Sequence, residues 1–305
     1  MSGADRASYL QGLLTNEVVA LNAGRGCYAA YLTPQGRMIA DLFVYEIGDL
    51  MLLSTPPAVK DVVLGKLEQF IFTEDVKLGD VTGSFAQLAV VGPTAAAVLS
   101  AALDGAPDAA LNALPEHGNL RATFAAQPVI VTRVTDTGEP GYDIYVERSH
   151  AEALRSALAA AGAAAIDADT AEAIRIEAGV PRFGRDMDED TIPLEAGIET
   201  RAISFSKGCY VGQEVIIRVL HRGHGRVARK LMGLRFDAGT VPPAGAAVRA
   251  GDREIGQVTS SARSPAAKQP IALAYLHRDF LTPGTAVSVD GAAAVVTELP
   301  FVQRA

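Results

Sequence analysis

The pattern of apolar and turn residues changes near residue 226, and this change constrains the fold more than any single motif. Before that point, short apolar runs alternate with stretches of helical period, whereas after it come short β-type runs that are cut by Gly and Pro. Evenly spaced short strands separated by turn residues are typical of small closed β-barrels. We therefore expect a C-terminal β-unit of about six strands after a boundary near residues 226–230.

The N-terminal part of the chain predicts strand–helix units with further strands between them. Three segments, which begin at Leu50, Phe85 and Tyr142, each join an apolar run to a stretch of helical period. Alternating runs such as VIVTRV lie between them, so strands outnumber helices and some neighbouring strands should pair antiparallel. The pattern predicts α+β layers and not a regular βαβ winding.

Composition excludes several classes of protein. Hydrophobic residues make up 49% of the chain and charged residues 20%, which excludes a disordered or fibrous chain. No apolar run reaches the roughly 18 residues of a membrane-spanning helix, and the first residues lack the pattern of a secretion signal. The two cysteines, Cys27 and Cys209, are too few for a disulfide framework. We therefore expect a globular cytoplasmic protein with no membrane partner.

Charge is distributed unevenly along the chain, whose net charge is −8. Residues 201–235 carry eight Lys and Arg against one acid, Glu214, whereas residues 185–199 carry an excess of acids. This stretch can form two solvated faces that neutralise each other, or a site for anions. Direct binding of nucleic acid is not expected, because few aromatic residues such as Tyr210 stand between the basic ones and base stacking needs more.

Common catalytic and metal-binding signatures are absent. The chain has no phosphate-binding glycine loop, no zinc-protease HExxH and no GxSxG nucleophile turn. His221 and His224 form an HxxH pair that Cys209 could extend to three metal ligands. A structural zinc site takes four ligands, so surface histidines are the favoured interpretation, and no metal is expected.

The strongest local signal is the octapeptide KGCYVGQE. Its glycines suggest a tight turn that opens a helix continuing through Arg218. A cysteine in the first turn of that helix, beside a lysine, would have its thiolate favoured by the helix dipole and by charge. The alternative is a small buried hydrophobic side chain, and the residues alone leave both open. The block consists of Lys207, Gly208, Cys209, Tyr210, Val211, Gly212, Gln213 and Glu214.

The KGCYVGQE block resembles the signature of the YgfZ family, folate-binding proteins that are similar to the T-protein (aminomethyltransferase) of glycine cleavage. The resemblance covers nearly the whole chain and implies a T-protein-like α+β fold. In this fold two interleaved α+β halves, residues 1–226, surround a central folate cavity, and residues 227–305 form a C-terminal β-barrel. Further matching blocks are YLQGLLTNEV, YLTPQGRMIADLFVY, GYDIYV and IRIEAGVPRFGRD.

The resemblance implies that tetrahydrofolate or a derivative is the cofactor, and it assigns two carboxylates. Asp41 matches the second acid of the Asp-Asp-Leu run of T-proteins, where that carboxylate faces the reacting nitrogen of the folate; Ala40 replaces the first acid. Asp143 occupies the place of the acid that hydrogen-bonds the pterin edge. A carboxylate suits that edge because it can accept two parallel hydrogen bonds from adjacent donors.

Three further side chains follow from the same resemblance. Arg175 matches an arginine near the folate, where it would hold either the glutamate tail or an internal acid. Tyr28 and Tyr31 could flank a ring by stacking, although packing in the core explains such aromatic residues at least as well.

The YgfZ resemblance implies an accessory protein for iron–sulfur cluster assembly or repair, with iron–sulfur client or assembly proteins as partners, among them enzymes that thiolate tRNA. Cys209 would be the functional thiol and Lys207 would set its charge environment. The alternative is a folate-dependent aminomethyltransferase with Asp41 as catalytic carboxylate, and the acidic stretch GRDMDEDTIPLE is closer to T-proteins. Binding of tRNA through the basic stretch is the least favoured of the three functions.

Overall fold

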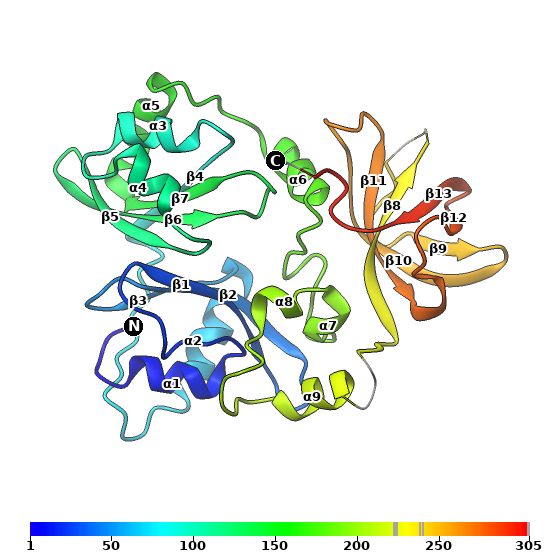
Figure 1. The fold of residues 1–305 in the computed structure, drawn as a ribbon, viewed down its shortest axis with the longest axis horizontal. Coiled ribbons are helices and arrows are strands. Elements are labelled where there is room, and N and C mark those ends of the chain that lie inside the picture. Colours follow the sequence, from blue (N-terminus) through cyan, green and yellow to red (C-terminus); the bar gives the residue numbers. More distant parts are fainter. Residues whose placement is uncertain (222–224, 238, 240, 304–305) are drawn as a thin grey trace. The chain divides into compact units, whose positions relative to one another are not determined.

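The structure is a computed structural model, and its described residues form two compact units that are interleaved along the sequence (Figure 1). Each unit is described by itself. The described residues are 1–221, 225–237, 239 and 241–303. Unit 1 comprises residues 1–29, 41–165 and 204–208, and unit 2 comprises residues 30–40, 166–203 and 209–305.

Unit 1 is built around two antiparallel sheets. The first sheet has the order β1-β2-β3, and the second has the order β4-β7-β6-β5. Residues 30–40, which include the end of β1 and the start of β2, belong to unit 2. The strands are β1 (Arg25–Leu32), β2 (Met38–Glu46), β3 (Met51–Ser54), β4 (Phe85–Val91), β5 (Asn119–Phe124), β6 (Gln127–Val134) and β7 (Gly141–Glu147). The helices are α1 (Arg6–Leu13), α2 (Lys60–Glu68), α3 (Ala95–Ala102), α4 (Asp108–Ala113) and α5 (Ala151–Ala160).

The second sheet has one face in the core and one face turned away from it. On β7, Tyr142, Ile144 and Val146 are fully buried against apolar residues of α3 and α5, which cover that face (Figure 1). Because side chains alternate along a strand, Asp143 and Tyr145 point to the opposite face. The period of two in GYDIYV therefore separates packing residues from those available to a site.

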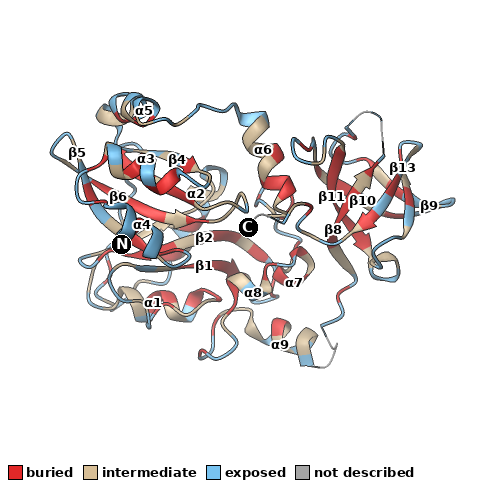
Figure 2. Cartoon of the chain, turned by 45° about the horizontal axis from the view of Figure 1, so that its top comes forward, coloured by how far each residue is buried: buried red, intermediate tan, exposed pale blue. Residues whose placement is uncertain are grey.

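Unit 2 contains a closed six-stranded barrel of order β10-β11-β8-β13-β12-β9, which confirms the expected C-terminal β-barrel. Buried apolar side chains fill its interior, and Figure 2 marks many residues of its strands as buried. In a second apolar cluster Ile176 packs with Leu273. The division at residue 226 stays a prediction. The strands are β8 (Arg229–Phe236), β9 (Ala247–Ala250), β10 (Arg253–Arg263), β11 (Pro270–His277), β12 (Ala286–Val289) and β13 (Ala292–Thr297), and the helices are α6 (Ala168–Glu177), α7 (Pro193–Ala196), α8 (Glu199–Ala202) and α9 (Gln213–His221). No helix of the described ranges has the length and apolar character that a membrane crossing requires.

A glycine contact fixes the start of α9 in unit 2. Gly212 has a left-handed backbone (φ +84°), and a Cβ added there would lie 2.5 Å from the carbonyl oxygen of Thr33. Gly36, in the turn between β1 and β2, is also left-handed, and its added Cβ would lie 2.9 Å from Cβ of Val215. The two glycines thus allow this turn to pack directly against the start of α9.

We predict that Gly212→Ala lowers the free energy of unfolding by about 1–3 kcal/mol, because alanine there is strained and meets main-chain atoms. Gly65→Ala is the matched control, since Gly65 lies inside α2 with no atom within 4 Å of the added Cβ. Alanine should stabilise that helix by about 0.5–1 kcal/mol. Urea denaturation measures both, and equal changes in the two variants would contradict the proposed role of Gly212.

Candidate functional site

A buried carboxylate and a tyrosine form the centre of the candidate site in unit 1. Asp41 lies on β2 and Tyr28 on β1, with 9% and 5% of their surface exposed. The hydroxyl of Tyr28 donates a hydrogen bond of 2.8 Å to Oδ2 of Asp41. A buried charge needs hydrogen-bond donors to compensate for lost water, so this contact stabilises the carboxylate in place.

Aromatic side chains extend the same face of β2. Phe43 and Tyr45 follow Asp41 at intervals of two residues, so the pleat brings all three to one face. The ring centroid of Phe43 lies 5.1 Å from that of Tyr28 and 5.3 Å from that of His117. His117 is buried and has a left-handed backbone (φ 58°), which is uncommon for a residue with a side chain.

Residues of β7 and β4 join this aromatic face within unit 1. The rings of Tyr45 and Tyr145 are 6.5 Å apart. Asp143 shares the face of Tyr145, and Nε2 of Gln87 donates a hydrogen bond of 2.7 Å to Oδ2 of Asp143. Burial raises the pKa of Asp143 to about 7, although the hydrogen bond from Gln87 acts in the opposite direction. Asp143 is therefore a carboxyl group that changes its charge near neutral pH.

Three hydroxyl groups near Asp143 are buried without a hydrogen bond of normal geometry to any described residue. They belong to Tyr45, Tyr145 and Thr132, and Thr132 lies opposite Asp143 in the β6–β7 register. Burial, above all, raises the pKa of both tyrosines, and the nearby charge of Asp143 adds to this. Buried polar groups normally have partners, so hydroxyls left in this state indicate a place for a polar ligand.

The arrangement offers the chemistry of a proton acceptor beside a site for a planar polar molecule. Asp41 is a fixed carboxylate, the aromatic rings provide apolar surface, and Asp143 with the three hydroxyls provides hydrogen-bonding groups. Aromatic rings with a polar edge, such as heterocycles, match this combination of surfaces.

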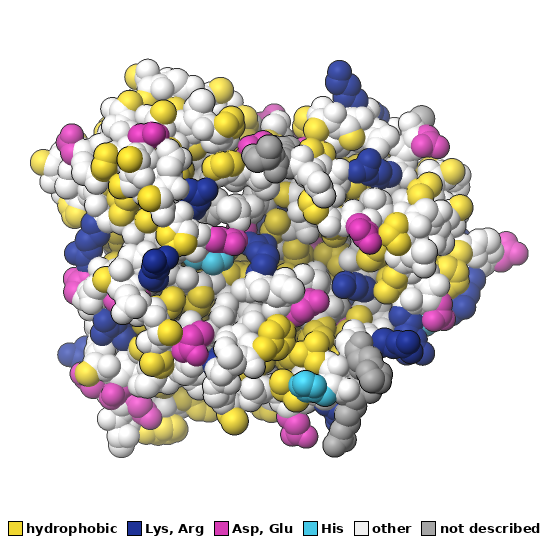
Figure 3. Space-filling view, in the orientation of Figure 1, with side chains coloured by type: hydrophobic (Ala, Val, Ile, Leu, Met, Phe, Trp, Pro, Cys, Tyr) yellow, Lys and Arg dark blue, Asp and Glu magenta, His cyan; other side chains and the backbone are white. Residues whose placement is uncertain are grey.

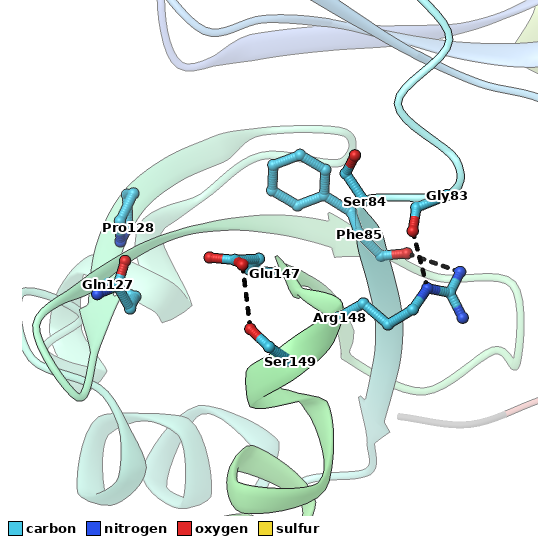
Figure 4. A pocket seen from close by; sticks show the side chains of 8 residues that line it. All are labelled: Gly83, Ser84, Phe85, Gln127, Pro128, Glu147, Arg148 and Ser149. Atoms are coloured by element: carbon cyan, nitrogen blue, oxygen red, sulfur yellow. Dashed lines mark hydrogen bonds between the residues drawn. The ribbon is translucent and has the colours of Figure 1, made fainter.

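The same face of the second sheet continues into a shallow pocket of about 470 Å³ (Figure 4). Glu147 stands two residues beyond Tyr145 on β7 and pairs in register with Phe85 on β4; both line the pocket. Arg148, which also lines it, donates hydrogen bonds to the carbonyl oxygens of Thr82, Gly83 and Phe85. The guanidinium of Arg148 is thus engaged in holding the local backbone.

Tyr28 and Tyr31 cannot flank the same ring from β1. They are three residues apart, so the pleat points them to opposite faces of the strand. Tyr28 faces Asp41, whereas Tyr31 is fully buried, and burial raises the pKa of its phenol. The expectation that both tyrosines stack on one ligand is therefore wrong.

Arg175 lies in a buried network of unit 2 and holds internal acids. Its Nη1 is 2.8 Å from Oδ2 of Asp186, and its Nε is 3.0 Å from Oε2 of Glu172. Its Nη2 donates to Oγ of Ser260 on β10 at 3.0 Å, which ties α6 to the barrel. Burial alone would raise the pKa of Glu172, but Arg175 and the neighbouring arginines lower it to about 2.

Lys207 is almost fully buried in unit 1, and its ammonium group is bound by main-chain oxygens. Nζ donates to the carbonyl oxygens of Gln11, Leu14 and Asn16 at 2.6, 2.7 and 2.9 Å. The three donors of an ammonium group are therefore all used. This geometry occupies Lys207 with the backbone of residues 11–16, and a role in catalysis by direct contact stays a prediction.

Cys209 differs from its expected position, because α9 begins only at Gln213. The thiol is exposed and lies before the helix, not in its first turn, so the expected helix-dipole effect on the thiolate does not apply. Tyr210 is buried, which raises its pKa to about 12. Gly212 of this block has a structural role, because it lies close to the main chain of Thr33. Gly208 and Glu214 are exposed.

Arg229 of the basic stretch is engaged in local contacts. In unit 2, Nε of Arg229 lies 3.2 Å from Oε2 of Glu195, and its guanidinium carbon lies 4.6 Å from the ring centroid of Tyr275. These side chains border a cavity of about 810 Å³ that carries charges of both signs. On the face seen in Figure 3, Lys and Arg are likewise mixed with Asp and Glu. At Arg229 the mixed charges favour a neutralised surface, and an anion site elsewhere in this stretch stays a prediction.

No cluster of three or more metal-ligating side chains occurs among the residues that the structure describes. His221 closes α9, whereas His224 lies outside the described residues, so the HxxH pair cannot be placed.

Comparison with known proteins gives matches over both parts of the chain. The GCVT N-terminal domain matches residues 1–207, and the glycine cleavage T-protein C-terminal barrel domain matches residues 229–303. An aminomethyltransferase of Streptomyces coelicolor is 32% identical over 315 residues, which cover 100% of this chain and 83% of the relative. One of Bacillus subtilis is 29% identical over 316 residues, covering 100% of this chain and 84% of the relative.

A solved structure shares the fold. The glycine cleavage system aminomethyltransferase T from Bartonella henselae superposes with a TM-score of 0.82 at 24% identity, covering 99% of this chain and 82% of that chain. The expected T-protein-like fold is thereby confirmed. The expected function in iron–sulfur cluster assembly is wrong, because the relatives that match over the full chain are named aminomethyltransferase. Membership of the YgfZ family is not shown by these matches.

Replacing Arg175 with methionine should lower the free energy of unfolding by about 3–5 kcal/mol, because Asp186 would remain buried without its charged partner. Arg182→Met is the matched control: Arg182 also pairs with Glu172, but its side chain is 52% exposed, so the loss should stay below about 1 kcal/mol. Urea denaturation measures both values. Similar losses in the two variants would contradict a buried structural role for Arg175.

Proposed function

The chain belongs to the glycine cleavage T-protein family, and from that premise we propose that it is a tetrahydrofolate-dependent aminomethyltransferase. Tetrahydrofolate, the cofactor expected from the sequence, is the cofactor of this family. The relatives that match over the whole chain carry the name aminomethyltransferase, and both family domains are matched in order. This function replaces the accessory role in iron–sulfur assembly and was the alternative drawn from the sequence.

The observation that carries the proposal is the Tyr28–Asp41 pair on the aromatic face of unit 1. Tetrahydrofolate supplies a secondary amine that becomes bonded to the transferred carbon. Such an amine must lose its proton as it bonds to the transferred carbon, while the bond of that carbon to its donor breaks and the donor keeps the electron pair. A fixed carboxylate can accept the proton. We assign this role to Asp41, because the hydrogen bond from Tyr28 holds its carboxylate in place on the aromatic face.

Asp143 and its neighbours fit the pterin end of the folate. An ionised carboxylate accepts two parallel hydrogen bonds from the adjacent amino and ring N–H groups of a pterin. The hydroxyls of Tyr45, Tyr145 and Thr132, which are buried without bonds of normal geometry, supply further donors and acceptors for the ring heteroatoms. Asp143 therefore binds and orients the pterin in this proposal, and Asp41 moves the proton.

Asp41→Asn should lower kcat by about a hundredfold or more, because general base catalysis contributes on the order of 10²–10⁴ and an amide cannot accept the proton. Tetrahydrofolate affinity should change little, since Asn keeps the shape of the side chain. Turnover is measured as transfer from the aminomethyl donor of a bacterial glycine cleavage system to tetrahydrofolate. Asp61→Asn, at an exposed carboxylate of α2, is the control and should keep the wild-type rate. An Asp41→Asn enzyme with wild-type kcat would refute the assignment.

Tetrahydrofolate affinity should rise as the pH increases from 6 to 8. Because the pKa of Asp143 is about 7, its carboxyl group is mostly protonated at pH 6 and mostly ionised at pH 8, and the ionised form accepts the hydrogen bonds of the pterin. The dissociation constant should fall about tenfold over this range. Anaerobic isothermal titration calorimetry suits the measurement, since the chain has no tryptophan for fluorescence.

Asp143→Asn should remove this pH dependence and weaken binding at pH 8 at least about tenfold, because hydrogen bonds to a charged group contribute about 1.5–3 kcal/mol. A wild-type affinity that does not vary with pH, or an Asn variant that keeps the same variation, would assign the pterin site to other residues.

A further inference from the structure

We propose that Lys207 positions the carboxylate of Asp41 from a distance, through a chain of hydrogen bonds that ends at the hydroxyl of Tyr28. The inference rests on the proposed function, in which Asp41 accepts the proton. It assigns a role to the lysine of the KGCYVGQE block, which the proposed reaction leaves unused. All members of the chain belong to unit 1.

The first link is the binding of the lysine ammonium by the end of α1. Gln11 lies in the last turn of α1, where main-chain carbonyls lack partners inside the helix, and Leu14 is its C-cap. Nζ of Lys207 binds the carbonyl oxygens of both and that of Asn16 at 2.6–2.9 Å. A positive charge at a helix C-terminus is also favoured by the helix dipole. The ammonium group thereby fixes the turn that follows α1.

The second link joins that turn to β1. The side chain of Asn16 donates from Nδ2 to the carbonyl oxygen of Tyr28 at 2.8 Å, and its Oδ1 accepts from the main-chain N–H of Glu17 at 2.8 Å. Asn16 thus binds the lysine through its backbone and the strand through its side chain. The position of Tyr28 along β1 depends on where this turn is held.

The third link reaches the carboxylate. The hydroxyl of Tyr28 donates to Oδ2 of Asp41 at 2.8 Å, while its ring packs against Phe43 with a centroid distance of 5.1 Å. A displacement of the strand by a fraction of an ångström would turn the carboxylate away from its reacting partner. A misplacement of 1 Å at a reacting group can lower a rate about a hundredfold, so a distant anchor can control kcat.

The lysine's titration gives this role a signature that a purely structural role lacks. Burial lowers the pKa of Lys207 to about 8, although the negative charge of Glu17, which faces it together with Cys27, acts in the opposite direction. Burial raises the pKa of the Cys27 thiol to about 12, so that group stays neutral here. Loss of the proton removes one of three donors and the charge. If the anchor positions Asp41, kcat should fall as the pH rises through about 8.

The free energy of unfolding should change in the opposite direction over that range. Because the folded pKa of Lys207 lies below its ordinary value of 10.5, the unfolded chain binds more protons between pH 8 and 10.5. The contribution of this group to stability therefore rises with pH there. A fall of kcat without a loss of stability separates positioning from simple unfolding.

The test is Lys207→Met, which keeps an unbranched side chain one atom shorter than lysine and removes its donors. We expect kcat to fall about ten- to hundredfold, tetrahydrofolate affinity to stay within about twofold, and the alkaline decrease of kcat near pH 8 to disappear. Lys77→Met is the matched control, because Lys77 is an exposed lysine of unit 1 and its loss changes the charge equally. It should behave as the wild type.

A double variant with Tyr28→Phe tests the path. If Lys207 acts through Tyr28, the double variant should be no slower than the slower single variant, since residues in one network are not additive. Rates that fall by the product of the two single effects would overturn the inference, and so would a folded Lys207→Met enzyme with wild-type kcat. Where Lys207→Met does not fold, Asn16→Ala removes the middle link and keeps the backbone carbonyl that binds Lys207; the same outcomes apply.

Failure of the proposed function can be told apart from failure of this inference. A 3-fluorotyrosine at position 28, observed by fluorine NMR, reports the surroundings of that phenol without any turnover. Its resonance should shift in Lys207→Met and in Asn16→Ala and stay unchanged in Lys77→Met. Absence of transferase activity in the wild type with these shifts present would refute the function and support the chain of contacts. An unchanged resonance in Lys207→Met would overturn the chain of contacts.

Discussion

The burial of the Asp41 carboxylate is the constraint on which the candidate site depends. A charged group at this depth is stable only with donors directed at it, and β1 provides one in the hydroxyl of Tyr28. Strand geometry then determines the surroundings: Phe43 and Tyr45 must share the face of Asp41, and an aromatic face results. The contact of Tyr45 with Tyr145 brings the face of β7 that carries Asp143 to the same region of unit 1. The alternation of side chains along two strands and one hydrogen bond thus place the Asp41 carboxylate and the titrating acid Asp143 in one region.

Much of the fold could be predicted because it depends on local patterns. The change of pattern near residue 226 predicted a C-terminal barrel, and the structure has β8 beginning at Arg229. Asp41 and Asp143 were predicted as site residues because they match family motifs. The side chains around them were missed: Tyr45, Tyr145 and Thr132 became visible only through pairings between strands distant in sequence. The period of two from each aspartate was a usable signal for the two tyrosines. His117 gave no signal, because its place depends on a contact with Phe43 from a different part of unit 1.

The KGCYVGQE block shows why a motif can identify a structure and still suggest the wrong function. Its cysteine attracted the functional interpretation, since a thiol beside a lysine suggests reactivity. In the structure the ammonium group of Lys207 donates to three main-chain carbonyl oxygens at and after the end of α1. Gly212 is required by the main chain of Thr33, and α9 begins only at Gln213. The backbone contacts of the block therefore explain most of its residue types without reference to Cys209.

Arg175 and Lys207 show why the partner of a buried cation determines which cation is used. Arg175 meets two carboxylates, and the planar fork of a guanidinium matches their pairs of oxygens. Lys207 meets three carbonyl oxygens that converge on one point, and an ammonium group directs three donors from a single atom. The sequence hides this difference, because the acids of Arg175 lie within eleven residues whereas the carbonyls that bind Lys207 lie more than 190 residues before it. Main-chain carbonyl acceptors cannot be recognised from residue types in the sequence. A lysine with no acid nearby can therefore be interpreted as catalytic although carbonyl groups at the end of a helix bind it. The link from that helix end through Asn16 to Tyr28 is then what connects such a lysine to the chemistry of Asp41.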